Sequence, residues 1–216
     1  MQAVEDIVVQ IYNELLSVDH KNERILVGIA GAPGAGKSTL SQALSTKLNK
    51  SEHVAAVIPM DGYHLDDSLL EDLGLLKRKG APETFDFAGF KHLLLRIKNE
   101  DEVVYPVFDR EREISIAGAG ILKKNIRIVI VEGNYLLFDE EPWSCLSKLW
   151  DYSVFLDVEL TVLEQRLIDR WLNHGFSRAE AQQKVLGNDI QNSKRVIASR
   201  IQADRIINGA RINKFE

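Results

Sequence analysis

Nine consecutive residues have the types and the spacing needed to hold the phosphates of a nucleotide. The first eight match the P-loop pattern G-x-x-x-x-G-K-[ST], and the nine are Gly31, Ala32, Pro33, Gly34, Ala35, Gly36, Lys37, Ser38 and Thr39. Glycines let the backbone turn so that its N–H groups converge on a phosphate, and the N-terminus of the following helix adds positive potential. We expect Lys37 to reach the β- and γ-phosphates of ATP and the Ser38 hydroxyl to bind Mg²⁺.

The alternative for this segment is a glycine-rich turn between a strand and a helix that binds no ligand. The apolar run ILVGIA at residues 25–30 predicts the strand that the pattern requires, so nucleotide binding is favoured. A P-loop alone does not separate kinases from GTPases, ATPase motors or regulatory switches. A GTPase is disfavoured because the sequence NKSE at residues 49–52 lacks the final Asp of the guanine-reading pattern N-K-x-D.

Two carboxylates follow predicted strands and could act on the bound phosphates. Asp61 follows the apolar segment at residues 54–58, whose carboxyl end lies at the same sheet edge as the P-loop in a doubly wound fold. A carboxylate there could orient an acceptor hydroxyl and accept its proton, although Asp61 before Gly62 is also typical of a plain turn. Glu132 ends the apolar run at residues 128–131, where an acid could lie near Mg²⁺. Its alternative is a turn or helix-capping acid.

Five segments together resemble the phosphoribulokinase/uridine kinase family of P-loop kinases, which includes bacterial type I pantothenate kinase. They are the P-loop, MDGYH at 60–64, GAPETFD at 80–86, PVFDR at 106–110 and VEGNYLL at 131–137. The resemblance covers most of the chain after the first predicted helix. It implies a P-loop NTPase fold, ATP and Mg²⁺ as cofactors, and an enzyme that phosphorylates a hydroxyl group of a small molecule.

The resemblance also implies roles for individual residues on the acceptor side. Asp61 matches the general base of the family, and Tyr63 and His64 belong to the segment that contacts the acceptor. Arg110 resembles an arginine that holds the acceptor, and Glu132 fits the family's Glu-Gly pair. The alternatives are a Tyr or His that packs with its polar tip satisfied, and an Arg on a solvated, mixed-charge face.

Arg166 and Arg170 lie four residues apart, and so on one face of the helix predicted at residues 161–173. They resemble the arginines that family members swing over the transferring phosphate. The alternative is a surface ion pair with Glu159, Glu164 or Asp169. After this helix the chain reads NHG where uridine kinases carry a further Arg-Asp pair, which disfavours a nucleoside acceptor. A later group resembles a stretch in sugar- and pantothenate-kinase-like members, or else only caps or bridges helices: Asn188, Asp189 and Asn192.

These residues predict a kinase that transfers the γ-phosphate of ATP to a small metabolite. A sugar or polyol is favoured as acceptor, and a pantothenate-like acid or a nucleoside stays open. The competing hypothesis is a regulatory P-loop ATPase without a small-molecule acceptor, which would not need Asp61. A degenerate member kept for protein contacts is disfavoured because it has no chemical reason to keep Lys37, Ser38, Asp61 and Glu132 together.

The elements that must position these residues alternate between strands and helices. Short apolar runs predict strands at residues 25–30, 54–58, 103–105, 126–131, 154–156 and 205–207, and helical spacing predicts a first helix over 4–16. Asp86 is expected to cap a helix, and capping-box patterns at Thr161 and Ser177 are expected to open two more. The pattern predicts one α/β domain over 1–216, a three-layer P-loop NTPase fold with a mainly parallel sheet flanked by helices. Residues 65–85 are expected to form a local excursion that serves as a lid.

Composition excludes several other classes of protein. The 216 residues carry a formal net charge of −5, so no overall basic field favours nucleic acid or an anionic membrane. A single cysteine, Cys145, excludes an internal disulfide and a cysteine zinc site. The chain begins MQAVED, without the basic start and apolar run of a signal peptide, and no run is long enough for a membrane span. We therefore expect a cytoplasmic protein, and a homodimer stays open.

Overall fold

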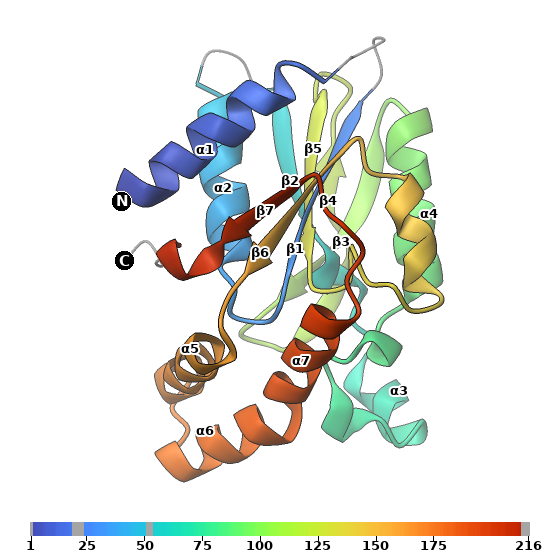
Figure 1. Ribbon diagram of the computed structural model, residues 1–216. Coiled ribbons are helices and arrows are strands. Elements are labelled where there is room, and N and C mark those ends of the chain that lie inside the picture. The colour runs from blue at the N-terminus through green and yellow to red at the C-terminus, as the bar shows by residue number, and fades with distance from the viewer. Residues whose placement is uncertain (1, 19–23, 51–53, 213–216) are drawn as a thin grey trace.

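Five parallel strands form the centre of the molecule (Figure 1). The computed structural model describes residues 2–18, 24–50 and 54–212. The sheet order is β2-β5-β1-β6-β7, with bounds β1 Ile25–Gly31, β2 Ala55–Pro59, β5 Ile128–Gly133, β6 Tyr152–Asp157 and β7 Arg205–Asn208. Every residue of β1 is buried, as expected for a central parallel strand covered on both faces. The predicted mainly parallel sheet is confirmed.

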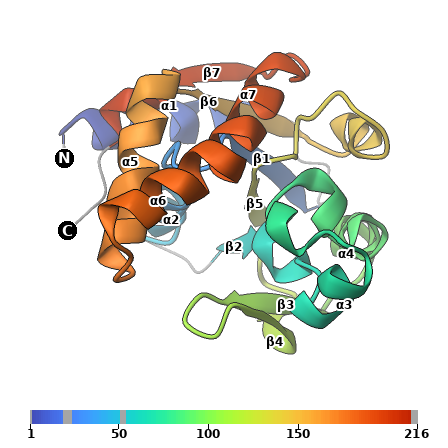
Figure 2. The same cartoon turned by 90° about the horizontal axis from the view of Figure 1, so that it is seen from below.

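Helices cover both faces of this sheet and extend beyond its carboxyl edge. Helices α1 (Gln2–Leu15) and α2 (Lys37–Leu48) lie on one face, and α4 (Phe87–Asn99) and the 3-10 helix η4 (Trp143–Lys148) lie on the other (Figure 1). Seen from below in Figure 2, α5, α6 and α7 gather on one side of the strand ends. Their bounds are α5 Leu160–Asn173, α6 Arg178–Lys184 and α7 Ile190–Ala198. The three-layer α/β architecture is therefore confirmed.

Residues 103–122 form a hairpin outside the main sheet, which the sequence did not predict. Strands β3 (Val103–Asp109) and β4 (Ile114–Leu122) pair with each other in an antiparallel two-stranded sheet. The segment of β4 reads ISIAGAGIL, and its Ala and Gly residues have low strand propensity. Gly120 leaves room for the ring of its cross-strand partner Tyr105, because a Cβ there would lie 2.4 Å from that ring.

Local capping signals were correct at two helices and wrong at a third. The Asp86 side chain accepts a hydrogen bond from the Gly89 N–H at the start of α4, and Ser177 forms a complete capping box with Glu180 at α6. Helix α5 instead begins at Leu160, one residue before the predicted cap Thr161, and no side chain caps it. The chain leaves β6 and turns directly into α5, so the sheet rather than a capping box fixes where this helix begins.

The excursion at residues 65–85 consists of α3 (Asp67–Asp72) and the short 3-10 helices η2 (Leu76–Arg78) and η3 (Pro82–Thr84). Two side chains from elsewhere hold its backbone. The Tyr135 hydroxyl donates to the Gly80 carbonyl at 2.6 Å, and the Asn188 side chain donates to the Lys79 carbonyl at 2.8 Å. A lid function for this segment stays a prediction. Within the described ranges, no helix has the length and apolar character that crossing a membrane requires.

Candidate active site

The P-loop has the backbone geometry that its glycines were expected to provide. Gly34 and Gly36 have φ angles of 79° and 97°, in the left-handed region that other residues rarely adopt. Gly36 is the N-cap of α2, and a Cβ added there would lie 2.8 Å from the Ile212 side chain. Both positions therefore require glycine, and the loop leads directly into the N-terminus of α2.

The Lys37 side chain is buried beside the loop and has two acceptors. Its Nζ donates to Asn134 Oδ1 at 2.7 Å and to the Ala32 carbonyl at 3.0 Å. Burial lowers the pKa of Lys37, and the negative charges of Glu132 and Asp61 act against this shift. Asn134 is a site residue that sequence reasoning missed. Its one signal was its place within VEGNYLL, two residues after Glu132 at the end of β5.

Ser38, in the first turn of α2, meets Glu132 near the end of β5, and these are the two residues of the predicted magnesium site. The Ser38 hydroxyl donates to Glu132 Oε1 at 2.8 Å, and Glu132 is only 6% exposed. In the pairing of β1 with β5, Glu132 lies opposite Ile29. The P-loop begins two residues after Ile29, so Glu132 lies on the strand next to the start of the P-loop. Burial raises the pKa of Glu132, and the charge of Lys37 opposes that rise.

A hydroxyl and a carboxylate are oxygen ligands of the kind that Mg²⁺ takes, so this pair fits the predicted ion. In the part of the chain that the structure describes, no three His, Cys, Asp or Glu residues are grouped to hold a metal alone. Mg²⁺ usually keeps several waters and is shared with substrate phosphates at such sites. Ser38 and Glu132 would accordingly hold it together with a nucleotide.

Asp61 lies in the 3-10 helix η1 (Met60–Tyr63), directly after β2. Its carboxylate accepts a hydrogen bond from Arg110 Nη2 at 2.8 Å. The turn packs tightly on β3, since a Cβ at Gly62 would lie 2.3 Å from the Pro106 carbonyl oxygen. This close packing of η1 on β3 brings the predicted base and the predicted acceptor-binding arginine together.

His64 and Tyr63 have different surroundings. His64 Nδ1 lies 2.8 Å from the Asp61 carbonyl oxygen, and its ring lies between those of Phe85 and Phe108 at centroid distances of 4.1 and 4.7 Å. Burial lowers the pKa of His64. The Tyr63 ring instead meets Phe90 of α4 edge-on at 5.4 Å, and burial raises its pKa to about 12. A role for either ring in binding the acceptor stays a prediction.

The two arginines of α5 occupy different places. Arg166 donates to four backbone carbonyls, those of Gly34, Gly209, Ala210 and Ile212, at 3.0–3.2 Å. It thereby fastens the end of the described chain to the P-loop. Arg170 lies within electrostatic range of Asp61, Glu113, Asp189 and Arg110, and burial lowers its pKa. Its guanidinium donates no hydrogen bond to any residue in the described ranges, so the two arginines are not equivalent.

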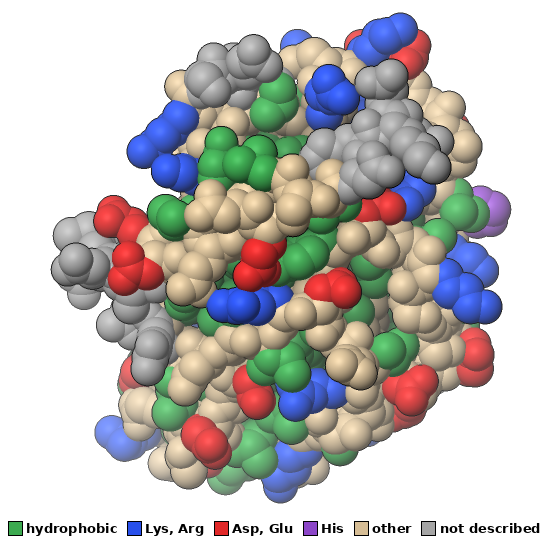
Figure 3. Space-filling model, turned by 45° about the horizontal axis from the view of Figure 1, so that its top comes forward, with side chains coloured by type: hydrophobic (Ala, Val, Ile, Leu, Met, Phe, Trp, Pro, Cys, Tyr) green, Lys and Arg blue, Asp and Glu red, His purple; other side chains and the backbone are tan. Residues whose placement is uncertain are grey.

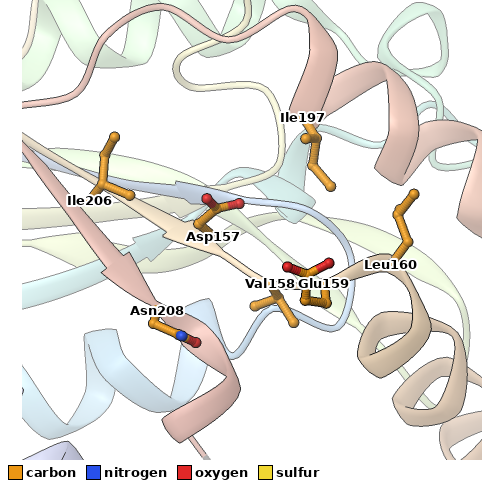
Figure 4. Close-up of a pocket in the computed structure, with 7 residues that line it drawn as sticks. All are labelled: Asp157, Val158, Glu159, Leu160, Ile197, Ile206 and Asn208. Carbon is orange, nitrogen blue, oxygen red and sulfur yellow. The ribbon is translucent and has the colours of Figure 1, made fainter.

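The described chain has a pocket beside the ends of β6 and β7 and another between two helices. One, of about 430 Å³, is drawn in Figure 4 and is lined by Asp157, Val158, Glu159, Leu160, Ile197, Ile206 and Asn208. These residues come from the ends of β6 and β7, the start of α5 and the end of α7, and none is a predicted site residue. The other, of about 810 Å³, is a groove between α1 and α2 that has Ser38 and Thr39 among its lining residues.

The surface charge is mixed on the face that Figure 3 shows. Lys and Arg side chains are scattered among Asp and Glu side chains there, and some of the two kinds lie in contact. This distribution agrees with the formal net charge of −5. Positive side chains in the described chain converge instead around Asp61, where the electrostatic neighbours of Lys37 include Arg110 and Arg170.

Known proteins resemble this chain along most of its length. The model of the phosphoribulokinase/uridine kinase family matches residues 26–214. The Escherichia coli (strain K12) protein "Uncharacterized protein YggC" is 34% identical, over 89% of this chain and 81% of that protein. The Schizosaccharomyces pombe "Putative uridine kinase C227.14" is 32% identical, over 94% of this chain and 91% of that protein.

A solved structure is similar in both fold and sequence. It is described as a "putative fructose transport system kinase" from Silicibacter sp. TM1040. The two structures superpose with a TM-score of 0.88 at 46% sequence identity, over 93% of this chain and 98% of the other. Helix α1 precedes the region that the family model matches, whereas every predicted site residue lies inside it.

Proposed function

The chain belongs to the phosphoribulokinase/uridine kinase family of P-loop kinases, and from this premise we propose that it transfers the γ-phosphoryl group of ATP to a hydroxyl group of a sugar or polyol. The observation that supports this most strongly is the position of Asp61. Its carboxylate lies close enough to the buried Lys37 ammonium to act on it together with Glu132. Transfer to an alcohol needs a potential base near the bound phosphates, and Asp61 lies within electrostatic range of the lysine that would reach them.

The P-loop, with its backbone N–H groups and Lys37, would hold the phosphates of ATP. Ser38 and Glu132 would hold Mg²⁺, which would supply positive charge to offset the negative charge of the phosphates. Arg170, which donates no hydrogen bond to the described residues, would contact the transferring phosphoryl group. Arg166 would keep the loop in place through its bond to the Gly34 carbonyl.

In the proposed reaction, the acceptor hydroxyl oxygen forms a bond to the γ-phosphorus while the bond from that phosphorus to the β,γ-bridging oxygen breaks. The hydroxyl proton passes to the Asp61 carboxylate, and ADP leaves with the bridging oxygen. In the structure, Arg110 donates a hydrogen bond to one carboxylate oxygen of Asp61. We infer that Arg110 turns from Asp61 to the acceptor when the acceptor binds, since its side chain is 49% exposed.

The choice of a sugar or polyol rests on two supports. The similar Silicibacter protein is described as a "putative fructose transport system kinase", and its identity of 46% is higher than the 32% of the Schizosaccharomyces "Putative uridine kinase C227.14". The sequence after α5 also departs from the uridine kinases at residues 173–175. ATP as donor and the single cysteine favour the cytoplasm as the place of this reaction.

The test is Mg²⁺-dependent ADP release from ATP across a panel of sugars, polyols, pantothenate and nucleosides. The proposal expects one class of acceptor to stimulate release strongly in the native chain and not in Asp61→Asn. Asp67→Asn is the matched control, because Asp67 is a carboxylate of α3 that pairs with Lys79 rather than with Arg110. ATP binding without stimulation by any acceptor would favour the regulatory ATPase instead.

A further inference from the structure

His64 directly follows the η1 turn that carries Asp61, and its side chain contacts the backbone of that turn. Its Nδ1 atom lies 2.8 Å from the Asp61 carbonyl oxygen, and its backbone N–H donates to the same oxygen at 3.1 Å. One residue therefore makes two contacts with one carbonyl group. The sequence predicted that His64 contacts the acceptor, whereas the structure shows it in contact with the backbone of the candidate base.

The contact with a carbonyl group determines which ring nitrogen of His64 carries a proton. A carbonyl oxygen can only accept, so Nδ1 is the donor, and the neutral ring then has no proton on Nε2. Burial lowers the pKa of His64. The charged groups around the ring are Asp61 and Glu113, which oppose this shift, and Lys79, which adds to it. We therefore expect a neutral ring at pH 7, in the Nδ1–H tautomer.

Packing keeps the ring of His64 in this orientation. The ring lies between those of Phe85 and Phe108, at centroid distances of 4.1 and 4.7 Å. The backbone of His64 is held as well, by an isolated β-bridge to Phe85 and by a hydrogen bond of 3.1 Å from Ser115 Oγ to its carbonyl oxygen. Because its side chain and its backbone are both fixed, His64 is a rigid support for the carbonyl group that it contacts.

A fixed carbonyl group restrains the peptide that joins Asp61 to Gly62. Gly62 is itself packed closely, since a Cβ there would lie 2.3 Å from the Pro106 carbonyl oxygen, and Met60 on the other side of Asp61 is fully buried. The backbone conformation limits the rotamers of a side chain. The backbone around Asp61 therefore determines where its carboxylate lies, which in the structure is 2.8 Å from Arg110 Nη2.

We propose that His64 is a positioning residue for the base: its Nδ1–H fixes the Asp61 carbonyl group, and thereby the direction in which the Asp61 carboxylate meets the acceptor hydroxyl. The inference rests on the proposed function, in which Asp61 accepts the proton of that hydroxyl. His64 takes no proton from the acceptor and acts only through Asp61. Loss of its Nδ1–H therefore slows the transfer step and leaves acceptor binding nearly unchanged.

Three substitutions separate this role from packing and from acceptor binding. His64→Asn keeps an N–H donor at the place of Nδ1, His64→Gln moves the donor toward the place of Nε2, and His64→Phe keeps an aromatic ring without a donor. Steady-state kinetics uses the acceptor that the panel identifies. We expect His64→Asn to keep kcat within about threefold of the native value. His64→Gln and His64→Phe are expected to lower kcat at least about tenfold, with the acceptor KM within about twofold of the native value.

Two further measurements and a control complete the test. Nδ1–H is present in both the neutral and the protonated ring, so kcat should depend on pH in the same way in His64→Asn and in the native chain. The ¹⁵N NMR shifts of the native ring at about pH 8, above the ordinary pKa of histidine, report its tautomer without any activity. The signals of His64 are those that His64→Asn lacks, and we expect the Nδ1–H tautomer. The control is His92→Gln, an exposed histidine of α4, which should leave kcat unchanged.

Four results would overturn the inference: an Nε2–H tautomer in the native chain, equal losses of kcat in His64→Asn and His64→Phe, a loss that falls on the acceptor KM instead of kcat, or a shifted pH profile in His64→Asn. If the variants show no thermal unfolding transition, the tautomer of the native chain decides. Failure of the proposed function has a different signature, because a native chain that phosphorylates no acceptor would contradict Asp61 as the base even with the Nδ1–H tautomer present.

Discussion

At the scale of single residues, the site depends on how a buried lysine is held before any phosphate arrives. Lys37 is 8% exposed, and the side chains of Glu132, Asp61 and Asn134 act on its ammonium group by charge or by hydrogen bonding. Only the neutral Asn134 accepts a hydrogen bond from Nζ among these three. An amide acceptor keeps the ammonium group in place without competing for it as strongly as a carboxylate would. Lys37 can then exchange this partner for a phosphate oxygen.

Asn134→Ala is expected to lower the rate of transfer by about tenfold, because a misplaced Lys37 loses part of its contact with the phosphates. Steady-state kinetics with the acceptor identified by the panel would measure it. Asn99→Ala is the control, since Asn99 donates to the Leu95 carbonyl at the end of α4, away from the P-loop. Equal kcat and KM in Asn134→Ala and the native chain would show that Asn134 has no part in positioning Lys37.

The residues of the site were predictable to different degrees, for physical reasons. Lys37, Ser38 and Glu132 belong to a local pattern and the end of a strand, and the structure brings them together. Asn134 was missed because a lone Asn after a strand also fits any turn. Arg166 and Arg170 share a helix face, and only tertiary contacts show that one is fastened to backbone carbonyls and the other is not.

At the scale of elements, a side-chain capping hydrogen bond can fix where a helix begins when the helix follows a loop. Asp86 accepts a hydrogen bond from the Gly89 N–H at 2.9 Å, and α4 then runs from Phe87 to Asn99 along one face of the sheet. The same helix carries Phe90, which meets Tyr63 of the η1 turn. A correct start of α4 therefore also supports the turn that holds Asp61.

Asp86→Ala is expected to lower the free energy of unfolding by about 1 kcal/mol, because it leaves an N–H at the start of α4 without its acceptor. Asp86→Asn keeps an oxygen acceptor and is expected to cost less than about 0.5 kcal/mol. Urea denaturation followed by circular dichroism measures both values. The capping account fails if the Ala and Asn variants lose the same stability.

A second element-scale prediction concerns the ion-pair cluster that joins the excursion to α7. Arg195 donates to Glu140 at 2.7 Å and to Glu83 at 3.0 Å. Its hydrogen bond holds the pKa of Glu140 below the ordinary value. Because the folded-state pKa is depressed, this contribution to stability is complete above the unfolded-state pKa, roughly 4.3, and is lost as the pH falls through the folded-state pKa.

The difference in stability between the native chain and Arg195→Met is therefore expected to be largest near pH 7 and to shrink below roughly pH 4.3. Denaturation at a series of pH values measures this. Arg96→Met is a matched control, because Arg96 forms an exposed i,i+4 pair with Glu100 within α4, and such pairs contribute little. A difference that does not vary with pH would contradict the assignment to Glu140.

The elements themselves were predictable where a pattern is local and strong. The parallel strands are short apolar runs, as expected for strands covered on both faces, whereas the sequence did not predict their order in the sheet. Strand β4 was missed because its alternation is hidden by Ala and Gly, and its strand conformation comes from pairing with β3. The capping box predicted at Thr161 was wrong because α5 begins at Leu160, shortly after the end of β6, and no side chain caps it.

At the scale of the whole molecule, the candidate site joins elements that are distant in sequence. The P-loop follows β1, Glu132 ends β5, Asp61 follows β2, and Arg170 comes from α5. A nucleotide with Mg²⁺ would contact several of these at once, whereas the unfolded chain cannot hold them together. Ligand binding should therefore stabilise the entire fold.

Mg²⁺ with ATP at a hundred times its dissociation constant is expected to raise Tm by roughly 5–10 °C, which corresponds to about 2.7 kcal/mol in a chain of this size. A chelator added with ATP should remove much of the shift, because Ser38 and Glu132 would then lose the shared ion. Differential scanning calorimetry measures this. An equal shift with and without the chelator would contradict the magnesium site, and Lys37→Ala should shift far less under either condition.

The central claim is that the γ-phosphoryl group goes to an organic hydroxyl and not to water. The most direct measurement follows the label of γ-³²P-ATP after incubation with the protein, Mg²⁺ and the acceptor panel, and separates organic phosphate esters from inorganic phosphate. We predict label in an ester of a sugar or polyol, and a loss of at least about a hundredfold in that label with Asp61→Asn. Label found only as inorganic phosphate, with or without acceptor and unchanged in Asp61→Asn, would contradict the claim.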